Sequence, residues 1–446
     1  MNNRMRAALG VPIAGLTVLM SALSTSAAPL SVSPRPAMGY NTWYQYRTNA
    51  DEADVLRQAR LLITTRLTAS GYNTVNLDDG WMAINRKKNG VLAWNAKKFP
   101  HGIPWLSARL HSMGLRFGIY EAIGTHTCQR FPGSSGHYQQ DAKTFAKWGV
   151  DFVKIDECGG LPARTTVASL TQDFRSYGAY LRAAMPVVVY SEELPIYAIG
   201  KPSFISTVRS SAGFANMWRV APDEYPLNIV NSMILSHLAD DLHLHAFAGP
   251  GHWNDLDMVA PAMPASGWSR GDLQSQLSVW AEEASPLLVS ANLAALTPAE
   301  LTDLKNPKMI AIDQSGSQAA IAVMSDRMEA LVKGADGGAA VLLVNLGRTT
   351  ATGKFSLSQL HISAKRASIY NVWIGSTRIA TKLVYKLASG STALLVLKGL
   401  GAPDGHRAHA HGHSGHGHSA HGHSGHGHSG RRLRAERPAI GLRRRP

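Results

Sequence analysis

The sequence predicts an α/β protein: a (β/α)8 TIM barrel followed by an antiparallel β-sandwich. From residue 38 to about 300, short apolar runs alternate with stretches whose apolar residues recur every three or four positions, as in amphipathic helices. Eight such β-then-α units over some 260 residues match the size of a TIM barrel. After about residue 310 the helical spacing stops, and short strand-like runs follow one another between Gly, Ser, Asp and Lys turns.

The eight expected barrel strands are residues 38–43, 74–79, 116–122, 151–157, 186–193, 216–220, 243–249 and 286–290. Segments 50–70 and 137–149 show the clearest helical spacing between them. A doubly wound open sheet is the alternative, but no Gly-rich turn follows the first strand, so a dinucleotide site is not expected. We expect residues 29–305 to form the barrel.

The second part of the chain should be a compact β-domain over residues 306–400. Its expected strands are 319–326, 328–335, 339–346, 367–373 and 392–399. No long helical pattern interrupts them, which favours a sandwich of antiparallel strands.

Residues 1–28 are typical of a secretory signal peptide. Arg4 and Arg6 precede an apolar stretch at 9–23, and small residues follow at 25–28. The stretch is short for a membrane span, so an uncleaved anchor is only the alternative. We expect a secreted protein, extracellular or periplasmic, with no membrane contact after cleavage. In that oxidising space Cys128 and Cys158 could pair.

Residues 401–446 are low in complexity and are expected to be disordered. Ten histidines lie between His406 and His428, and an Arg-rich stretch follows. Clustered imidazoles can bind zinc, nickel or copper. We expect a solvated tail with adventitious metal affinity; a dedicated metal-binding role is the alternative.

The formal charge of +15 on 446 residues is unevenly distributed. The tail from residue 401 contributes +6 and the first 27 residues +2, which leaves a modest +7 for the rest. No nucleic-acid partner is therefore expected. With 45% hydrophobic residues the chain can bury a large core, and two cysteines exclude a disulfide-rich scaffold or a four-cysteine metal site.

Polar side chains recur at the ends of the expected strands, where TIM barrels carry their working residues. These are Trp43, Asp78, Asp79, Tyr120, Lys154, Asp156, Glu193, Arg219, Asp223, Asp255 and Asp257. A single acidic residue there could be a helix cap or turn residue. Repeated carboxylates point to metal binding, for instance magnesium or calcium, or to acid–base and nucleophilic chemistry.

Asp156 is the candidate nucleophile. Lys154 lies two residues earlier, on the same face of the strand, and a fixed cation keeps a carboxylate ionised while competing with a metal. Glycoside cleavage needs a second carboxylate. Asp223, four residues after Arg219, is expected to be less tightly held in its ionised form, which suits a general acid. The spacing alone does not choose it over Glu224 or Asp255.

Aromatic residues also lie close in sequence to these acids: Trp43, Trp81, Tyr120, Tyr197 and Trp253. Aromatic faces beside carboxylates suit sugar rings, whose C–H faces stack while their hydroxyls bond to charged groups. Ordinary core packing explains about half of them equally well.

Consecutive motifs resemble glycoside hydrolase family 27, the α-galactosidases. They are MGYNTW, NLDDGW, the stretch 117–158, YSEELPIY, MWRVAPD and AGPGHWNDLDM, in order over residues 35–315. The resemblance implies a TIM barrel, an antiparallel β-domain, and a retaining mechanism without cofactor or metal. It places the nucleophile on Asp156 in K-x-D-x-C and the acid/base on Asp223. Galactose-binding positions fall on Trp43, Asp78, Asp79, Tyr120, Lys154, Glu193, Tyr197, Arg219 and Asp257.

The resemblance also implies a Cys128–Cys158 disulfide behind the active site. In this family the loop carrying Glu193 and Ile196 surrounds the sugar's 2-position, and a bulky Ile196 favours a hydroxyl over an N-acetyl group. The chain departs from many relatives at Gly80 and Glu192, where they carry cysteines, and at Glu157, where the residue is often small.

The sequence therefore indicates a secreted retaining α-galactosidase that acts on galactose-containing oligo- or polysaccharides. Activity on β-L-arabinopyranosides is the alternative within the family, although Asp78 and Asp79, expected to hold hydroxyls including that on C6, argue against it. A secreted carbohydrate- or metal-binding protein is the non-enzymatic alternative. The presence of both Asp156 and Asp223 counts against the first, and the second rests on the His-rich tail alone.

Overall fold

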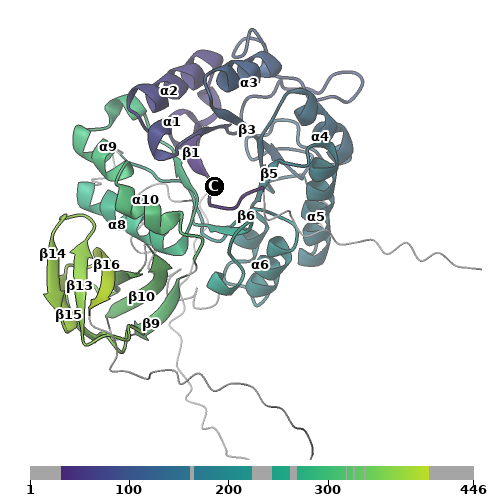
Figure 1. Ribbon diagram of the computed structural model, residues 1–446. Helices are drawn as coiled ribbons and strands as arrows, with labels where there is room; N and C mark the ends of the chain where they lie inside the picture. Colours follow the sequence, from purple (N-terminus) through teal and green to yellow (C-terminus); the bar gives the residue numbers. More distant parts are fainter. Residues whose placement is uncertain are drawn as a thin grey trace, which may run out of the picture. The chain divides into compact units, whose positions relative to one another are not determined.

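A computed structural model (Figure 1) describes residues 32–160, 165–223, 244–261, 269–317, 319–324, 327–335 and 338–400. The expected signal peptide, the histidine- and arginine-rich tail and Glu224 lie outside these residues. In the described part of the chain, no helix is long and apolar enough to cross a bilayer.

Eight parallel strands form the barrel in the order β7-β6-β5-β4-β3-β2-β1-β8. Their bounds are β1 Met38–Asn41, β2 Thr74–Leu77, β3 Arg116–Ala122, β4 Phe152–Asp156, β5 Val189–Glu192, β6 Met217–Arg219, β7 Trp253–Asp255 and β8 Leu287–Val289. Just after β7, Val259 forms a parallel bridge with Val289 of β8, so the first and last strands meet through consecutive neighbours. The predicted TIM barrel is confirmed.

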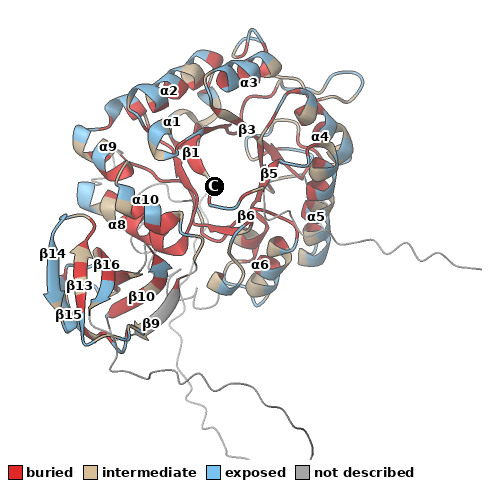
Figure 2. Ribbon diagram, viewed as in Figure 1, coloured by how far each residue is buried: buried red, intermediate tan, exposed pale blue. Residues whose placement is uncertain are grey.

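Helices follow the strands around the outside of the barrel (Figure 1). Figure 2 shows buried strands inside a ring of helices with exposed outer surfaces. The helices are α1 Trp43–Tyr46, α2 Glu52–Thr64, α3 Ile103–Ser112, α4 Tyr138–Lys147, α5 Val167–Ala184, α6 Phe204–Ala212, α8 Arg270–Glu283, α9 Pro298–Leu304 and α10 Pro307–Asp313.

Helix α2 illustrates why the spacing was predictive. Val55, Ala59 and Leu62 recur at helical spacing and are buried, which gives the helix one apolar face. Asp51 caps its start by accepting a 2.8 Å hydrogen bond from the Asp54 amide.

The seventh strand was predicted in the wrong place. Residues 244–246 form a short 3-10 helix, and the strand is the three-residue segment Trp253–Asp255. The reason is that this strand carries polar residues into the barrel: Asn254 is buried and accepts a 2.8 Å bond from the Trp218 indole. A buried strand with polar side chains has no apolar run to detect.

The C-terminal domain is the predicted antiparallel β-sandwich. Its six-stranded sheet has the order β14-β13-β16-β11-β10-β9, and β12 and β15 form a second sheet. The strands are β9 Ala320–Met324, β10 Met328–Ala335, β11 Gly338–Asn345, β12 Ala351–Ser356, β13 Arg366–Asn371, β14 Thr377–Ala380, β15 Lys382–Leu387 and β16 Thr392–Leu400. Strands β12, β14 and β15 were not predicted because charged and polar residues interrupt their apolar positions.

One face of the six-stranded sheet packs on helix α8. The Trp373 indole donates a 2.8 Å bond to Ser278 Oγ, and Lys333 Nζ on β10 donates a 2.6 Å bond to the Ala281 carbonyl. The region between barrel and sheet also contains α10, although we expected only strands after residue 306.

Lys333 has four buried carboxylates around it: Glu282, Glu283, Asp313 and Glu329. Burial raises the pKa of Glu282 to about 8 and the pKa of Glu329 to about 7. Neither oxygen of Glu329 has a hydrogen-bond partner among the described residues. One lysine cannot neutralise four carboxylates, so some of these groups are more stable protonated in the folded protein.

Replacing Glu329 with Gln should stabilise the protein at alkaline pH. A carboxylate whose folded pKa is raised favours folding below its unfolded pKa, and that contribution is lost as pH rises through the folded pKa of about 7. We expect Glu329→Gln to increase the free energy of unfolding by about 1–3 kcal/mol at roughly pH 8 and little at roughly pH 5. Calorimetric unfolding at both values measures this; an equal gain at both would contradict the interpretation.

Candidate active site

A pocket of about 510 Å³ opens at the carboxyl ends of the barrel strands. Every site residue predicted from the sequence lines it except Arg219 and Asp257. The lining consists of Trp43, Asp78, Asp79, Tyr120, Cys128, Gln129, Lys154, Asp156, Cys158, Glu193, Ile196, Tyr197, Pro222, Asp223 and Met258.

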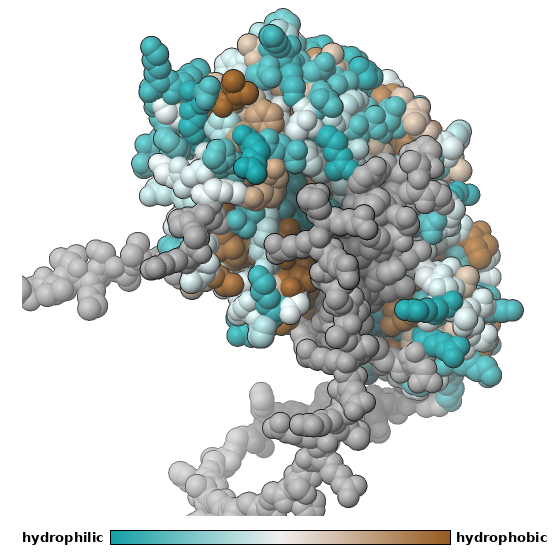
Figure 3. Space-filling view, turned by 180° about the vertical axis from the view of Figure 1, so that it is seen from behind, coloured by the Kyte–Doolittle hydropathy of each residue, from teal (hydrophilic) through white to brown (hydrophobic). Residues whose placement is uncertain are grey.

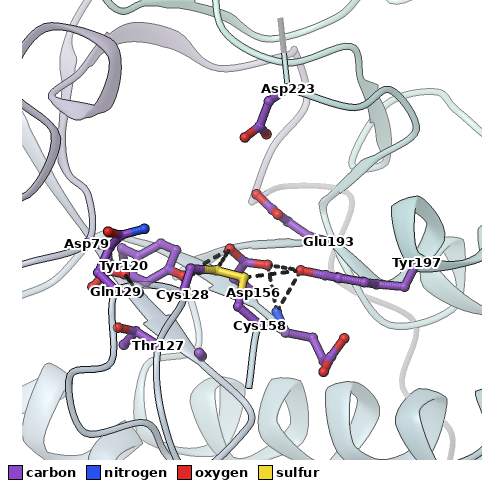
Figure 4. Close-up of a disulfide and its surroundings, with 12 residues drawn as sticks. Asp79, Tyr120, Thr127, Cys128, Gln129, Asp156, Cys158, Glu193, Tyr197 and Asp223 are labelled. Atoms are coloured by element: carbon purple, nitrogen blue, oxygen red, sulfur yellow. Dashed lines mark hydrogen bonds between the residues drawn. A yellow bond between two sulfur atoms is a disulfide. The ribbon is translucent and has the colours of Figure 1, made fainter. Parts of the chain in front are cut away.

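Asp156, the last residue of β4, is buried and held by three donors (Figure 4). Tyr120 Oη donates a 2.9 Å bond to Oδ2, the Glu157 amide donates a 2.6 Å bond to Oδ1, and Tyr197 Oη also donates to Oδ1. Hydrogen bonds to both oxygens favour the ionised form and fix the carboxylate in one orientation.

Lys154 points from the same strand to two other carboxylates. Its Nζ lies 3.1 Å from Asp78 Oδ2 and 3.2 Å from Glu193 Oε1. Burial acts to lower the pKa of Lys154, but Asp78, Glu193 and Asp156 together raise it well above its usual value. The lysine therefore stays charged and links the carboxylates that follow β2, β4 and β5.

The two adjacent aspartates after β2 differ. Asp78 accepts a 2.8 Å bond from Asn41 Nδ2 in addition to its contact with Lys154. In Asp79, burial raises the pKa to about 6. Asp79 Oδ2 accepts a 3.0 Å bond from the Gln129 amide, while Oδ1 has no hydrogen-bond partner among the described residues, so Asp79 has an oxygen available to a ligand hydroxyl.

Arg219 and Asp257 lie behind the pocket surface. Arg219 Nη1 is 3.2 Å from Glu193 Oε1 and 3.0 Å from Asp257 Oδ1, and its Nη2 is 3.2 Å from Asp223 Oδ1. Tyr44 Oη donates to the other oxygen of Asp257. Both Asp257 oxygens are thus engaged with protein groups, and this arrangement makes Asp257 a partner of Arg219.

The carboxylates of Asp156, Glu193 and Asp223 follow one another across the site (Figure 4). In Asp223 burial acts to raise the pKa, but Arg219, Lys154 and Arg47 bring it below its usual value. We expected Asp223 to be the less firmly ionised carboxylate, and in this structure that expectation is wrong. Glu193 shows the opposite shift: burial and then Asp156 raise its pKa to about 8 despite Lys154 and Arg219.

Cys128 and Cys158 are joined by a disulfide, with their Cα atoms 4.5 Å apart. The bond connects the loops that follow β3 and β4 and lines the pocket, where we expected it behind the site. Cys128 Sγ lies 3.0 Å from Asp156 Oδ2. These three residues form the one described group of His, Cys, Asp or Glu with ligand atoms within 4.8 Å of one another, but the bonded sulfurs offer no thiolate to a metal.

Three lining residues were not predicted: Gln129, Pro222 and Met258. Each is adjacent in sequence to a predicted residue, which was the only signal for them. Of the aromatic candidates, Trp81 and Trp253 are core residues whose indoles donate to backbone carbonyls of Tyr120 and Ser33. Asp255 is buried and accepts from the Asp257 amide, so it does not line the pocket.

The family described as alpha galactosidase A matches residues 35–315 of this chain. The chain belongs to glycoside hydrolase family 27. Alpha-galactosidase A of Aspergillus niger is 31% identical over 394 residues, which cover 82% of this chain and 70% of that protein. This enzyme is therefore a glycoside hydrolase.

Two solved structures of the family share the fold. The crystal structure of α-galactosidase I from Mortierella vinacea is similar with a TM-score of 0.74 at 24% identity, covering 83% of this chain and 99% of that one. A β-L-arabinopyranosidase from Geobacillus stearothermophilus is similar with a TM-score of 0.73 at 18% identity, covering 83% and 99%. At these identities the likeness establishes the architecture alone.

Removing the disulfide should destabilise the enzyme. It closes a loop of 30 residues, and the lost constraint on the unfolded chain is worth about 2–4 kcal/mol. We expect Cys128→Ala/Cys158→Ala to unfold at lower denaturant than the wild type. Reductant should lower the wild-type midpoint and leave the variant unchanged; a variant that also responds would show that reductant acts elsewhere.

Proposed function

We propose that this enzyme is a secreted retaining α-galactosidase that releases terminal, non-reducing α-D-galactosyl residues. The observation that carries the proposal is that Asp156 and Asp223 border one pocket whose other walls are carboxylates, hydroxyls and Trp43. Retaining glycoside hydrolases use such a pair, one as nucleophile and one as acid and then base.

In the first step an Asp156 carboxylate oxygen attacks the anomeric carbon while the glycosidic C–O bond breaks. Asp223 gives its proton to the departing oxygen, which leaves a glycosyl ester on Asp156. In the second step Asp223 takes a proton from water, whose oxygen attacks the same carbon and releases Asp156. Two inversions return the sugar in the α configuration.

Asp223 must be protonated for the first step. Its side chain is 61% exposed, and a bound sugar would cover it. Loss of water from around a carboxylate raises its pKa, which opposes the effect of Arg219. Substrate binding would thus convert the ionised Asp223 described above into the acid that the first step requires.

Glu193, Ile196 and the two aspartates after β2 support galactose as the sugar. Ile196 and Glu193 fill the wall where the family surrounds the 2-position. Asp79 Oδ1 is available to a hydroxyl, and Asp78 is held rigidly by Lys154 and Asn41. The competing reading is a β-L-arabinopyranoside, which lacks the C6 hydroxymethyl group that this pair of aspartates would hold.

Substitution of either proposed catalytic residue tests the mechanism. We expect Asp156→Asn to lower kcat on p-nitrophenyl α-D-galactopyranoside by several orders of magnitude, because a neutral amide cannot attack. Asp223→Asn should cost about 10²- to 10⁴-fold on raffinose-type substrates and much less on the nitrophenyl glycoside, whose leaving group needs little protonation. Asp173→Asn on α5, outside the pocket lining, is the control. Ordinary turnover in Asp156→Asn would exclude the mechanism.

Changing the 2-position wall should alter substrate choice. We expect Glu193→Ser/Ile196→Ala to gain activity on the N-acetyl-α-D-galactosaminide and to lose activity on the galactoside, because it makes room for the acetamide and removes a hydroxyl partner. Comparison of kcat/KM for both substrates, with the β-L-arabinopyranoside beside them, measures the switch. Wild-type preference for the arabinopyranoside would overturn the choice of sugar.

A further inference from the structure

The positive charge of this protein is concentrated in the β-domain. Residues 338–400 contain eight lysines and arginines and no aspartate or glutamate, whereas residues 32–337 contain 27 basic against 28 acidic residues. The barrel and its surroundings are therefore nearly neutral. The +7 that sequence arithmetic leaves for the body of the chain is almost entirely a property of one domain.

All eight cations are exposed: Arg348, Lys354, Lys365, Arg366, Arg378, Lys382, Lys386 and Lys398. The second sheet arranges three of them on one face. In the register of β12 and β15, Lys354 pairs with Val384, which has Lys382 and Lys386 two positions away on either side. Successive residues alternate between faces, so these lysines project together from the side opposite the domain core.

The inner face of the same sheet explains this alternation. Phe355, Leu383 and Leu387 are buried and belong to the hydrophobic core of the sandwich, so the residues between them must face outward. The outer face consists of Thr352, Lys354, Ser356, Lys382, Val384 and Lys386, and we refer to it as the lysine face.

Arg378 on β14 extends the lysine face. Its guanidinium lies 5.0 Å above the Tyr385 ring, and its Nη2 is 3.5 Å from the Val384 carbonyl. Among the described residues, none of Lys354, Lys382 and Lys386 has a carboxylate within ion-pair distance. Figure 3 shows hydrophilic side chains gathered over this domain, at the lower right in that view.

Protection against edge-to-edge aggregation is the simplest explanation of lysines on a two-stranded sheet. It accounts for one or two cations along an edge. It does not account for a face with lysines at consecutive outward positions of β15, nor for 63 residues without an acid to balance them. Unbalanced like charges destabilise a folded domain by mutual repulsion, which points to a partner that neutralises them.

We propose that the lysine face docks an anionic polysaccharide. An extended polyanion fits cations spread along flat strands, and the hydroxyls of Thr352 and Ser356 between the lysines suit sugar hydroxyls. Single-stranded nucleic acid is disfavoured because proteins bind it with aromatic side chains that stack on bases, and the outer face has none. The partner is recognised by regularly spaced carboxylates or sulfates along a sugar chain.

This docking is separate from catalysis, because no residue of the lysine face lines the pocket. A pocket of this size accepts the end of a sugar chain. A second surface would hold a polymer that carries many such ends, and would raise their local concentration. The inference therefore concerns where the enzyme is retained, and it stands or falls independently of Asp156 and Asp223.

The test compares two triple variants of the full chain that remove the same charge. Lys354→Gln/Lys382→Gln/Lys386→Gln neutralises the lysine face, and Lys88→Gln/Lys97→Gln/Lys143→Gln neutralises three exposed lysines of the barrel. Binding to immobilised polygalacturonate in about 20 mM salt is measured for each, since low salt leaves surface charges unscreened. We expect about tenfold weaker binding for the first variant and wild-type binding for the second.

Three outcomes would overturn the proposal: equal losses in both variants, no loss in the first, or wild-type binding to duplex DNA as tight as to polygalacturonate. The first would mean that only net charge matters, and the last would make the surface a general polyanion or nucleic-acid site. Neutral galactomannan serves as the uncharged polymer and should bind all three proteins alike. Hydrolysis of the nitrophenyl galactoside should be unchanged in both variants, which keeps this result distinct from any failure of the proposed activity.

Discussion

The active-site pocket depends on one buried cation, the guanidinium of Arg219. Carboxylates that follow three different strands, Glu193, Asp223 and Asp257, all lie within 3.2 Å of it. Without that charge, buried Glu193 and Asp257 would repel each other, at a cost that ion-pair geometry alone could not offset. The same contact sets the charge of Asp223, so the group that holds the pocket together also determines how the proposed acid must be protonated.

Most of the fold could be predicted because apolar spacing is a direct record of which residues are buried. Helix α2 and strand β4 follow that rule closely. Strand β7 does not, because Asn254 and Asp255 are buried for their polar contacts and leave no apolar run. Strands β12 and β15 are hidden for a related reason: their outward positions carry lysines, which break the apolar pattern although every second residue is in the core.

The site was predictable as a set of residue types and less so as a set of contacts. The position of each acid at a strand end follows from the barrel topology, which brings the ends together. Which cation each acid meets depends on side-chain direction: Lys154 contacts Asp78 and Glu193 most closely, although Asp156 is its nearest acid in sequence. The charge state of Asp223 depends on Arg47 as well, and no sequence spacing links those two residues.

Asp257 adopts a backbone conformation with φ of 89°, a region that side chains with a Cβ seldom occupy. Glycine enters it freely, and asparagine and aspartate more readily than other residues. Asp257 must also bring a negative charge to Arg219, which glycine and asparagine cannot do. Glutamate would bring the charge on a longer side chain from a backbone it disfavours. Of the twenty amino acids, aspartate alone meets both demands, so this position has almost no freedom to vary while Arg219 stays.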